Sequence, residues 1–155
     1  MEQLIFSPEF SIDEVQLTYT RTFKINDRRI INSSKAVAKL FKEIWDDSRM
    51  DLVEQLKVLY LSNMNSVLAL AEQSSGSCTQ TVVDPRIIFA TALKLNAKRI
   101  ILVHNHPSGN TKPSNADIAI TQQLIKAGKL LDIEVLDHII ITRESYFSMV
   151  DEGLV

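Results

Sequence analysis

The chain has 155 residues, of which 45% are apolar and 23% are charged, and its formal net charge at pH 7 is −2. These values are typical of one globular domain with a sizeable core, and they exclude a general attraction to nucleic acid or to an anionic membrane. The only cysteine, Cys78, cannot form an internal disulfide, which fits a reducing compartment. No apolar run approaches the roughly 20 residues that span a bilayer, and the N-terminus lacks a signal-peptide pattern. We therefore expect a cytoplasmic protein.

The N-terminal third carries the weaker patterns. Residues 14–25 alternate loosely between apolar and polar side chains and predict one strand. Residues 33–47 predict a helix, because two serines that can cap it precede apolar residues at helical spacing. We therefore predict an N-terminal extension over residues 1–48, a strand and a helix packed on a core domain that covers residues 49–155.

A hairpin is predicted near the start of the core domain. Residues 54–61 read EQLKVLYL and alternate as a strand does, and residues 66–72 form the return strand after the polar loop Ser62–Asn65. A turn at Gly76–Cys78 then leads into a short predicted strand, Thr79–Val83.

Helices and strands alternate in the rest of the chain. The dipeptide Asp-Pro predicts the start of a helix over residues 85–96, since Asp is a preferred N-cap and Pro fits the first helical position. The β-branched run Ile100–Val103 predicts a buried strand. A further helix is predicted from Asn115 to about Lys126, with Gly128 as the residue that ends it, and a strand follows over residues 132–142.

The buried strand ends in two histidines that we interpret as metal ligands. Side chains alternate along a strand, so His104 and His106 point to the same side, about 6.7 Å apart along the backbone. Pro107 favours an extended conformation at His106, and the Ser, Gly, Asn and Pro residues that follow predict a turn. That turn can return Asp117, in the first turn of the next helix, towards both imidazoles.

Two histidines and one aspartate are three ligands that Zn²⁺ accepts. A site with only three protein ligands keeps a fourth position for water, as catalytic zinc sites do. A second interpretation stays open, since Ser114 and Asp117 also fit a capping box at the start of a helix. An H-x-H pair alone is a weak signal, but its conjunction with a rigid turn, a capping serine and an inward aspartate favours the metal site.

These residues carry a resemblance to a known family. The pattern H-x-H, seven residues, S, two residues, D is the JAMM motif of JAB/MPN metalloproteases, and it is matched here by His104, His106, Ser114 and Asp117. The wider stretch HNHPSGNTKPSNAD, together with LDHIII at residues 136–141, resembles the RadC family of bacterial JAB-domain proteins. The similarity runs from about Val53 to Gly153.

The predicted fold class is α/β (α+β), with a mixed β-sheet flanked by helices, because a strand hairpin is followed by alternating strands and helices. The resemblance implies the JAB/MPN fold, which is similar to the cytidine-deaminase sandwich. Deamination itself needs H-x-E and P-C-x-x-C motifs, and the sequence has neither. The H-E-x-x-H motif of helical zinc proteases is also absent from the sequence.

The resemblance implies hydrolysis of a peptide or isopeptide bond. The family uses a glutamate far upstream of the histidines as general base, which matches Glu54, although Glu72 is a rival candidate. We expect this glutamate to take a proton from a water that Zn²⁺ acidifies. The resemblance assigns Ser114 a hydrogen bond to the oxyanion, which is compatible with capping because a cap oxygen only accepts.

The third histidine, His138, lies alone in the apolar strand over residues 132–142. By itself it is typical of a hydrogen-bonded core residue. The resemblance implies that Asp137 and His138 could support the metal site from outside the ligand set, and we predict no catalytic role for them.

Two other classes of function stay open. The family name suggests a DNA-repair accessory, which the acidic balance and the lack of a basic stripe disfavour. A non-catalytic interaction module is the other, which the intact ligand set disfavours. We expect an unidentified peptide or protein substrate and no direct nucleic-acid or membrane partner. A homo-oligomer stays open as an alternative to a monomer.

Overall fold

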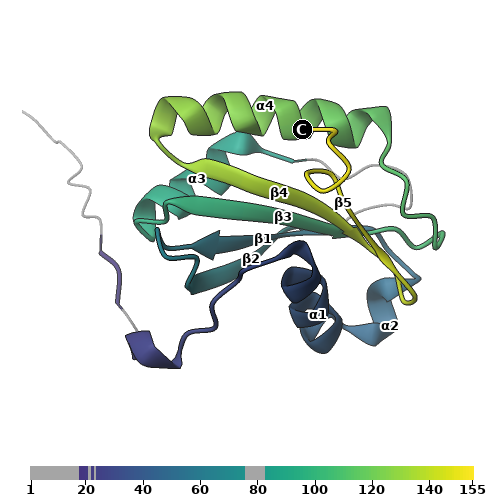
Figure 1. Ribbon diagram of the computed structural model, residues 1–155, viewed down its shortest axis with the longest axis horizontal. Coiled ribbons are helices and arrows are strands. Elements are labelled where there is room, and N and C mark those ends of the chain that lie inside the picture. Colours follow the sequence, from purple (N-terminus) through teal and green to yellow (C-terminus); the bar gives the residue numbers. More distant parts are fainter. Residues whose placement is uncertain (1–17, 21, 23, 76–82) are drawn as a thin grey trace, which may run out of the picture.

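The computed structural model describes residues 18–20, 22, 24–75 and 83–155. The helices and strands of these residues are η1 (Ile25–Asp27), α1 (Ser34–Ile44), α2 (Asp47–Met50), β1 (Gln55–Leu61), β2 (Val67–Ser75), α3 (Pro85–Lys94), β3 (Arg99–Asn105), α4 (Asn115–Leu131), β4 (Glu134–Ile141) and β5 (Tyr146–Ser148). Figure 1 shows their arrangement.

One mixed sheet organises the molecule, in the order β2-β1-β3-β4-β5. Strands β3 and β4 are parallel, and every other neighbouring pair is antiparallel. Because parallel neighbours need a crossover, the chain leaves β3, runs through α4 over one face of the sheet and returns into β4 (Figure 1). The predicted α/β fold with a mixed sheet and flanking helices is confirmed.

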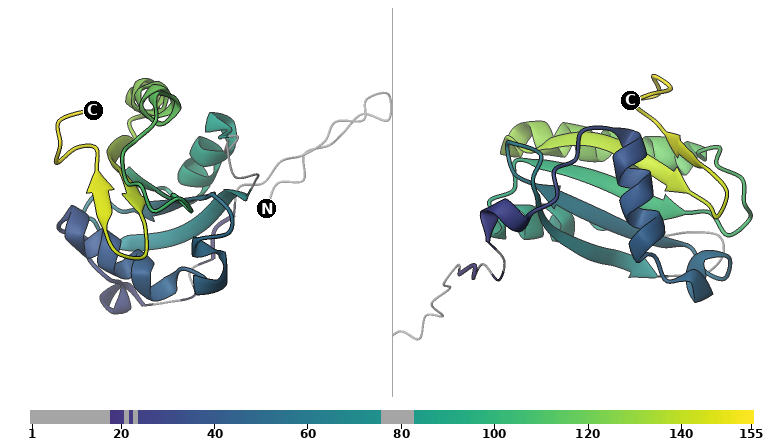
Figure 2. Two further views of the ribbon diagram at one scale, coloured as in Figure 1. Left: turned by 90° about the vertical axis from the view of Figure 1, so that its right-hand side faces the viewer. Right: turned by 60° about the horizontal axis from the view of Figure 1, so that its bottom comes forward.

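Helices cover both faces of the sheet. Figure 2 shows α3 and α4 on one face and α1 and α2 on the other. The apolar side chains divide in the same way. The cluster on the α3/α4 face includes Leu56, Val58, Tyr60, Ile88, Phe89, Ala92, Ile100, Leu102 and Leu124. The cluster on the α1/α2 face includes Phe41, Trp45, Met50, Leu59, Leu61, Ile101, Val103, Ile139 and Ile141.

The two faces meet in β3, which is buried on both sides from Ile100 onward. Since side chains alternate along a strand, His104 continues the row of Ile100 and Leu102 on the α3/α4 face. Its neighbour Asn105 continues the row of Val103 on the α1/α2 face. Strand β3 therefore carries a buried polar side chain to each face at its C-terminal end.

A β-bulge in β4 decides where His138 points. Ile100 pairs with Val135, but Ile101 pairs with Asp137, so one extra residue, Leu136, lies between the two pairs. Residues three apart in a regular strand point to opposite faces. The bulge resets the alternation, so Val135 and His138 both lie on the α3/α4 face, where His138 pairs with Leu102.

The prediction that Gly128 ends the helix that starts at Asn115 is wrong. Helix α4 continues to Leu131 and is capped by Asp132, whose φ of 56° is left-handed. Gly128 lies within the helix, where an added Cβ would come within 2.3 Å of the Ile133 carbonyl oxygen. The glycine permits the close approach of helix and strand rather than ending the helix.

Most other elements agree with the sequence analysis. Helix α1 begins after its cap Ser33, the hairpin β1–β2 turns at Ser62–Asn65, and α3 begins after its cap Asp84. The strand predicted over residues 14–25 does not form in its described part, which ends in the 3-10 helix η1. The strand predicted at Thr79–Val83 lies outside the described residues up to position 82, and Val83 is not in a strand.

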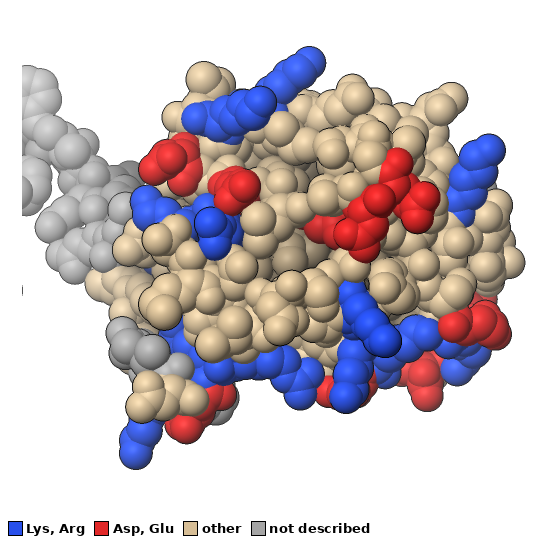
Figure 3. Space-filling view, in the orientation of Figure 1, with Lys and Arg blue, Asp and Glu red and all other residues tan. Residues whose placement is uncertain are grey.

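Charged side chains on the face seen in Figure 3 form small groups of both signs, separated by uncharged surface. Among the described residues, no helix combines the length and the apolar character that crossing a bilayer requires.

Candidate metal centre

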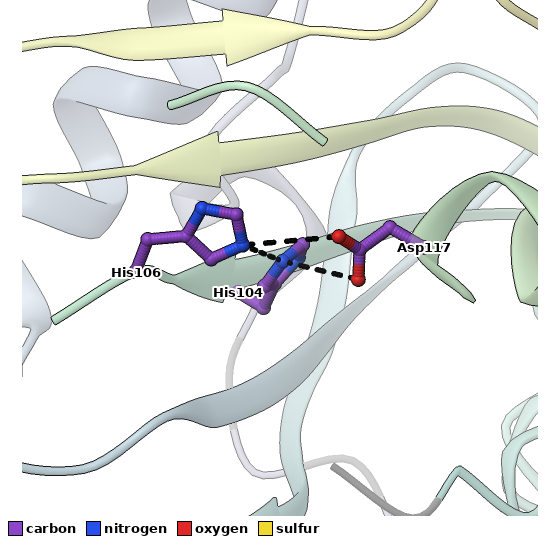
Figure 4. A group of neighbouring side chains, drawn as sticks. All are labelled: His104, His106 and Asp117. Atoms are coloured by element: carbon purple, nitrogen blue, oxygen red, sulfur yellow. Dashed lines mark hydrogen bonds and ion pairs between the residues drawn. The ribbon is translucent and has the colours of Figure 1, made fainter. Parts of the chain in front are cut away.

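Two side chains at the end of β3, His104 and His106, converge with Asp117 from the first turn of α4 (Figure 4). The Nε2 atoms of His104 and His106 lie 2.9 Å apart. Asp117 places Oδ1 at 3.4 Å from Nε2 of His104 and Oδ2 at 3.8 Å from Nε2 of His106. His104 is buried, while the side chains of His106 and Asp117 are 15% and 16% exposed, so the site is open on one side.

The turn after His106 fixes the second imidazole. The Gly109 N–H donates to the His106 carbonyl at 3.0 Å, and Gly109 has a φ of 77°, a conformation that glycine adopts without strain. The backbone of His106 donates to the Ile141 carbonyl at 3.2 Å, and its ring Nδ1 lies 2.5 Å from the Asn110 carbonyl oxygen. Because a carbonyl only accepts, Nδ1 carries a proton, and a metal ion would bind through the other ring nitrogen, Nε2.

The predicted capping box is present at the start of α4. The Asp117 N–H donates to Ser114 Oγ at 3.1 Å, and the Ser114 N–H donates to Asp117 Oδ2 at 2.7 Å. The Ser114 hydroxyl also donates to Oδ2, at 2.6 Å. These bonds hold one carboxylate oxygen and aim the other, Oδ1, at His104, so Asp117 is both the third residue of the capping box and a candidate metal ligand.

The tautomer of His104 follows from a chain of hydrogen bonds. The Thr121 hydroxyl donates to the Asp117 carbonyl at 2.6 Å, so it can only accept from His138 Nδ1, which lies 2.6 Å away. His138 Nε2 must then accept from Nδ1 of His104, at 2.8 Å. The proton of neutral His104 therefore sits on Nδ1, and its Nε2 has a free lone pair.

Burial keeps both inner imidazoles neutral. Desolvation lowers the pKa of His138 to about 3, with a further contribution from the nearby His106. Desolvation also lowers the pKa of His104 well below its usual value; the nearby His138 and His106 add to this effect, and the carboxylate of Asp117 opposes it. Neutral imidazole is the form that binds metal.

The resulting donor set suits a cation. Two imidazole lone pairs and a carboxylate oxygen face one another within 4.8 Å, and none of the three brings a proton to the space between them. With Zn–N and Zn–O bonds of about 2.0–2.1 Å, tetrahedral ligands lie about 3.3 Å apart. The two Nε2 atoms are 2.9 Å apart, Asp117 Oδ1 lies 3.4 Å from Nε2 of His104, and all three ligand atoms lie within 4.8 Å of one another. The residues present therefore fit a divalent metal ion such as Zn²⁺.

The register of β1 bears on the two candidate general bases. Leu56 pairs with His104 in an antiparallel register, and Glu54, which precedes β1, is half-buried. Continued by two residues, this register would bring Glu54 level with His106. Glu72 pairs with Lys57, and the two side chains lie 3.8 Å apart. Lys57 stacks 4.2 Å from the ring of Trp45, which places Glu72 on the α1/α2 face, away from the imidazoles.

Asn105, between the two histidines, is a structural residue that the sequence analysis missed. It is fully buried, and its amide donates to the carbonyls of Met50, at 2.6 Å, and Val53, at 2.9 Å. Its Oδ1 accepts the Gln55 N–H at 2.8 Å. Asn105 thus fixes the backbone on both sides of Glu54. Its one sequence signal is an amide at the end of an otherwise apolar strand.

Asp137 does not contact the ligand set. Its carboxylate accepts from the Ser148 hydroxyl at 2.6 Å and from the N–H groups of His138, at 2.7 Å, and Val150, at 3.2 Å. Burial raises the pKa of this carboxyl group, and the hydrogen bonds oppose that rise. Asp137 holds the turn after β5, whereas His138 bonds directly to a ligand.

A family model described as a RadC-like JAB domain matches residues 31–154 of this chain. The chain belongs to the RadC-like JAB-domain family. The match begins before the boundary that we predict between residues 48 and 49, and α1 packs in one cluster with the strands.

Relatives of this JAB domain are UPF0758 proteins. One from Syntrophomonas wolfei is 42% identical over 129 residues, which cover 83% of this chain and 55% of the relative. One from Methanosarcina mazei is 41% identical over 134 residues, covering 86% and 57%. One from Flavobacterium johnsoniae is 46% identical over 101 residues, covering 65% and 44%. The JAB domain thus spans about half the length of the curated relatives it matches.

Proposed function

We propose that this chain is a metal-dependent hydrolase that cleaves a peptide or isopeptide bond, with Zn²⁺ as its ion. The observation that carries the proposal is the convergence of two imidazole lone pairs and a carboxylate oxygen at an open site. Three such ligands leave a coordination position for water, which distinguishes catalytic from structural zinc sites. When bound, Zn²⁺ would act as a Lewis acid that acidifies water and polarises a carbonyl group.

Glu54 is the proposed general base. The register of Leu56 with His104, continued two residues beyond β1, supports this role because it would bring Glu54 level with His106, and Asn105 anchors the backbone that precedes and follows Glu54. A half-buried carboxylate held there can accept a proton without a large movement of the chain. Glu72 faces Lys57 on the other side of the sheet and is a poor candidate for this role.

Ser114 is the proposed hydrogen-bond donor to the oxyanion. Its hydroxyl donates to Asp117 Oδ2 in the described geometry, so it would have to turn from that oxygen towards the substrate. The Ser114 N–H would still hold Oδ2 during this turn, because the backbone bond at 2.7 Å does not depend on the hydroxyl. The carboxylate would therefore keep its orientation while the serine changes its partner.

Metal analysis of the purified chain tests the ligand set. We expect one equivalent of zinc in the wild type and less than a tenth of an equivalent in His104→Ala and Asp117→Ala. The matched control is Asp84→Ala, which removes an aspartate that caps α3 away from the site and should leave the zinc content unchanged. Equal zinc in all four proteins would overturn the assignment of the ligands.

A paired substitution tests the general base. With zinc bound, Glu54→Gln should reduce cleavage of a fluorogenic peptide library and of a lysine-linked isopeptide library by about 10²-fold or more, without loss of metal. Glu72→Gln should leave cleavage unchanged. A zinc-loaded wild type that cleaves neither library would contradict the hydrolase proposal, and equal losses in both variants would contradict the role of Glu54.

A further inference from the structure

A chain of three hydrogen bonds links His104 to the backbone of Asp117 through two residues outside the candidate ligand set. It runs from the ring of His104 to His138 at 2.8 Å, then to Thr121 at 2.6 Å, and from there to the backbone carbonyl of Asp117 at 2.6 Å. His104, His138 and Thr121 are each at most 2% exposed. These residues are therefore shielded from water, although the side chains of His106 and Asp117 are partly exposed.

Each proton in this chain of hydrogen bonds has one permitted position. The Asp117 carbonyl can only accept, and it takes the single proton of the Thr121 hydroxyl. Thr121 must then accept from His138, and His138 must accept from His104. No other arrangement of neutral groups satisfies all three contacts, so one carbonyl at the start of α4 fixes the tautomer of a ring on β3.

We propose that His138 and Thr121 are positioning residues of the metal centre: they hold His104 in the tautomer that leaves Nε2 free for a metal ion, and they tie its ring to the helical turn that carries Asp117. This inference rests on the proposed function, because it assumes that the three converging side chains bind a metal. The opposite tautomer, with the proton on Nε2, would block the coordination position. His138 contacts Nδ1 of His104 rather than the Nε2 atom that faces Asp117, so it acts through His104.

The chemical nature of the group that accepts from His104 affects the net charge of the metal centre. Metal-bound histidines usually donate to a carboxylate, a backbone carbonyl or water, and a carboxylate adds negative charge to the centre. Here the acceptor is a second imidazole, that of His138, which carries no negative charge. A Zn²⁺ centre with one carboxylate ligand would therefore keep a formal charge of +1, and its Lewis acidity would not be reduced by a second anion.

The backbone gives independent support for this role. His138 reaches the α3/α4 face only because the bulge at Leu136 shifts the alternation of β4 by one residue. Bulges of this kind re-aim a side chain next to functional sites and interrupt regular pairing. Without the bulge, the alternation of β4 would direct His138 to the α1/α2 face, away from His104.

Nitrogen-detected NMR of the histidine rings tests the tautomer in the metal-free protein at pH 7.5. In the wild type we expect the protons of His104 and His138 on Nδ1. In His138→Leu, His104 should lose this preference and populate the form protonated on Nε2. A wild-type spectrum with the His104 proton on Nε2 would overturn the proposal, whatever the chain does with metal or substrate.

Zinc affinity, measured by competition with a chromophoric chelator, is the second readout. We expect His138→Leu and Thr121→Val to weaken zinc binding about 10- to 100-fold. Thr121→Ser keeps the hydroxyl and should bind as the wild type does, and His138→Gln, whose amide oxygen can accept from His104, should recover part of the loss. Circular dichroism checks the fold, and Thr121→Val provides the same test if His138→Leu does not fold.

The outcomes separate this inference from the proposed function. Zinc affinity of His138→Leu and Thr121→Val within twofold of the wild type would overturn the positioning role and leave the ligand assignment intact. Loss of zinc in His104→Ala without any hydrolysis by the wild type would overturn the hydrolase proposal and leave the positioning role intact.

Discussion

His104 and Asn105 are neighbours in β3, both are buried, and they show two opposite uses of a polar side chain. Asn105 faces α1 and α2 and matches each of its three contacts, two donors to carbonyls and one acceptor from an N–H. His104 faces α3 and α4 and is matched on Nδ1 only. Its Nε2 lies near a second lone pair and a carboxylate.

The difference separates a framework group from a binding group. A buried polar group whose contacts all match stabilises the fold and has no capacity left for a ligand. A cluster with more acceptors than donors is unfavourable by itself and becomes favourable when a cation enters. Four experiments test this distinction, and we take them in order of expected effect.

Zinc should produce the largest change in stability. A ligand that binds only the folded state adds about 4 kcal/mol to the free energy of unfolding at 1,000 times its Kd. We expect an increase of this size for the wild type in urea unfolding at pH 7.5, and its removal by a chelator. His104→Ala should show no increase, while Asp84→Ala should show the full effect; a zinc effect that survives in His104→Ala would place the ion elsewhere.

Asn105→Ala should produce the next largest change, in the absence of any metal. It leaves the Gln55 N–H and the carbonyls of Met50 and Val53 without their partner, at about 1–3 kcal/mol for each buried group that stays unpaired. We expect a loss of about 3 kcal/mol in urea unfolding with chelator present. The exposed Asn32→Ala is the control and should change stability by about 0.5 kcal/mol or less. A loss for Asn105→Ala as small as that of the control would mean that Asn105 is no framework group.

Tyr60, on the α3/α4 face, is a further test of the distinction between framework and binding groups. Its buried hydroxyl donates to the Ile88 carbonyl at 3.3 Å and accepts from Gln73 at 3.2 Å, and burial raises its pKa to about 12. Since the unfolded chain ionises first, near pH 10, it binds fewer protons than the folded chain between pH 10 and 12. The contribution of Tyr60 to stability is complete below pH 10 and falls as pH rises through this window.

The slope of this loss approaches about 1.4 kcal/mol per pH unit. Thermal unfolding from pH 9 to 11 should show a smaller loss of stability in Tyr60→Phe than in the wild type. Parallel pH profiles for the two proteins would show that Tyr60 ionises as easily in the folded chain as in the unfolded one.

Asp117→Asn should give the smallest effect, and in the opposite direction. The amide can keep one oxygen for the Ser114 N–H and turn its NH₂ towards the bare Nε2 atoms of His104 and His106. We expect the metal-free variant to be as stable as the metal-free wild type or more stable by up to about 1 kcal/mol, while zinc no longer stabilises it. A loss of more than about 1 kcal/mol would show that the surplus of acceptors carries no energetic cost.

Much of the ligand set could be predicted because it follows from local rules. Side chains two apart on a strand share a face, which places His104 and His106 together. A serine and an aspartate three residues apart at a helix start each accept the backbone N–H of the other, which places Ser114 and Asp117. The Asp-Pro start of α3 and the Ser33 cap of α1 follow from the same rules, which act within four residues.

Other features depend on contacts between distant segments. Asn105 bonds to groups 50 to 55 residues away, and His138 bonds to partners 17 and 34 residues away. The face of Glu72 depends on the register between β1 and β2. Gly128 is required by the Ile133 carbonyl beside it rather than by the end of a helix, so a local glycine rule gave the wrong boundary.

The sequence by itself determined which residues could bind a cation, because the periodicity of strands and the capping of helices are set by neighbouring residues. Only the tertiary structure decided which lone pairs are free to do so. The bulge in β4 and the packing of α4 bring His138 and Thr121 against His104, and the positions of their protons follow from that contact.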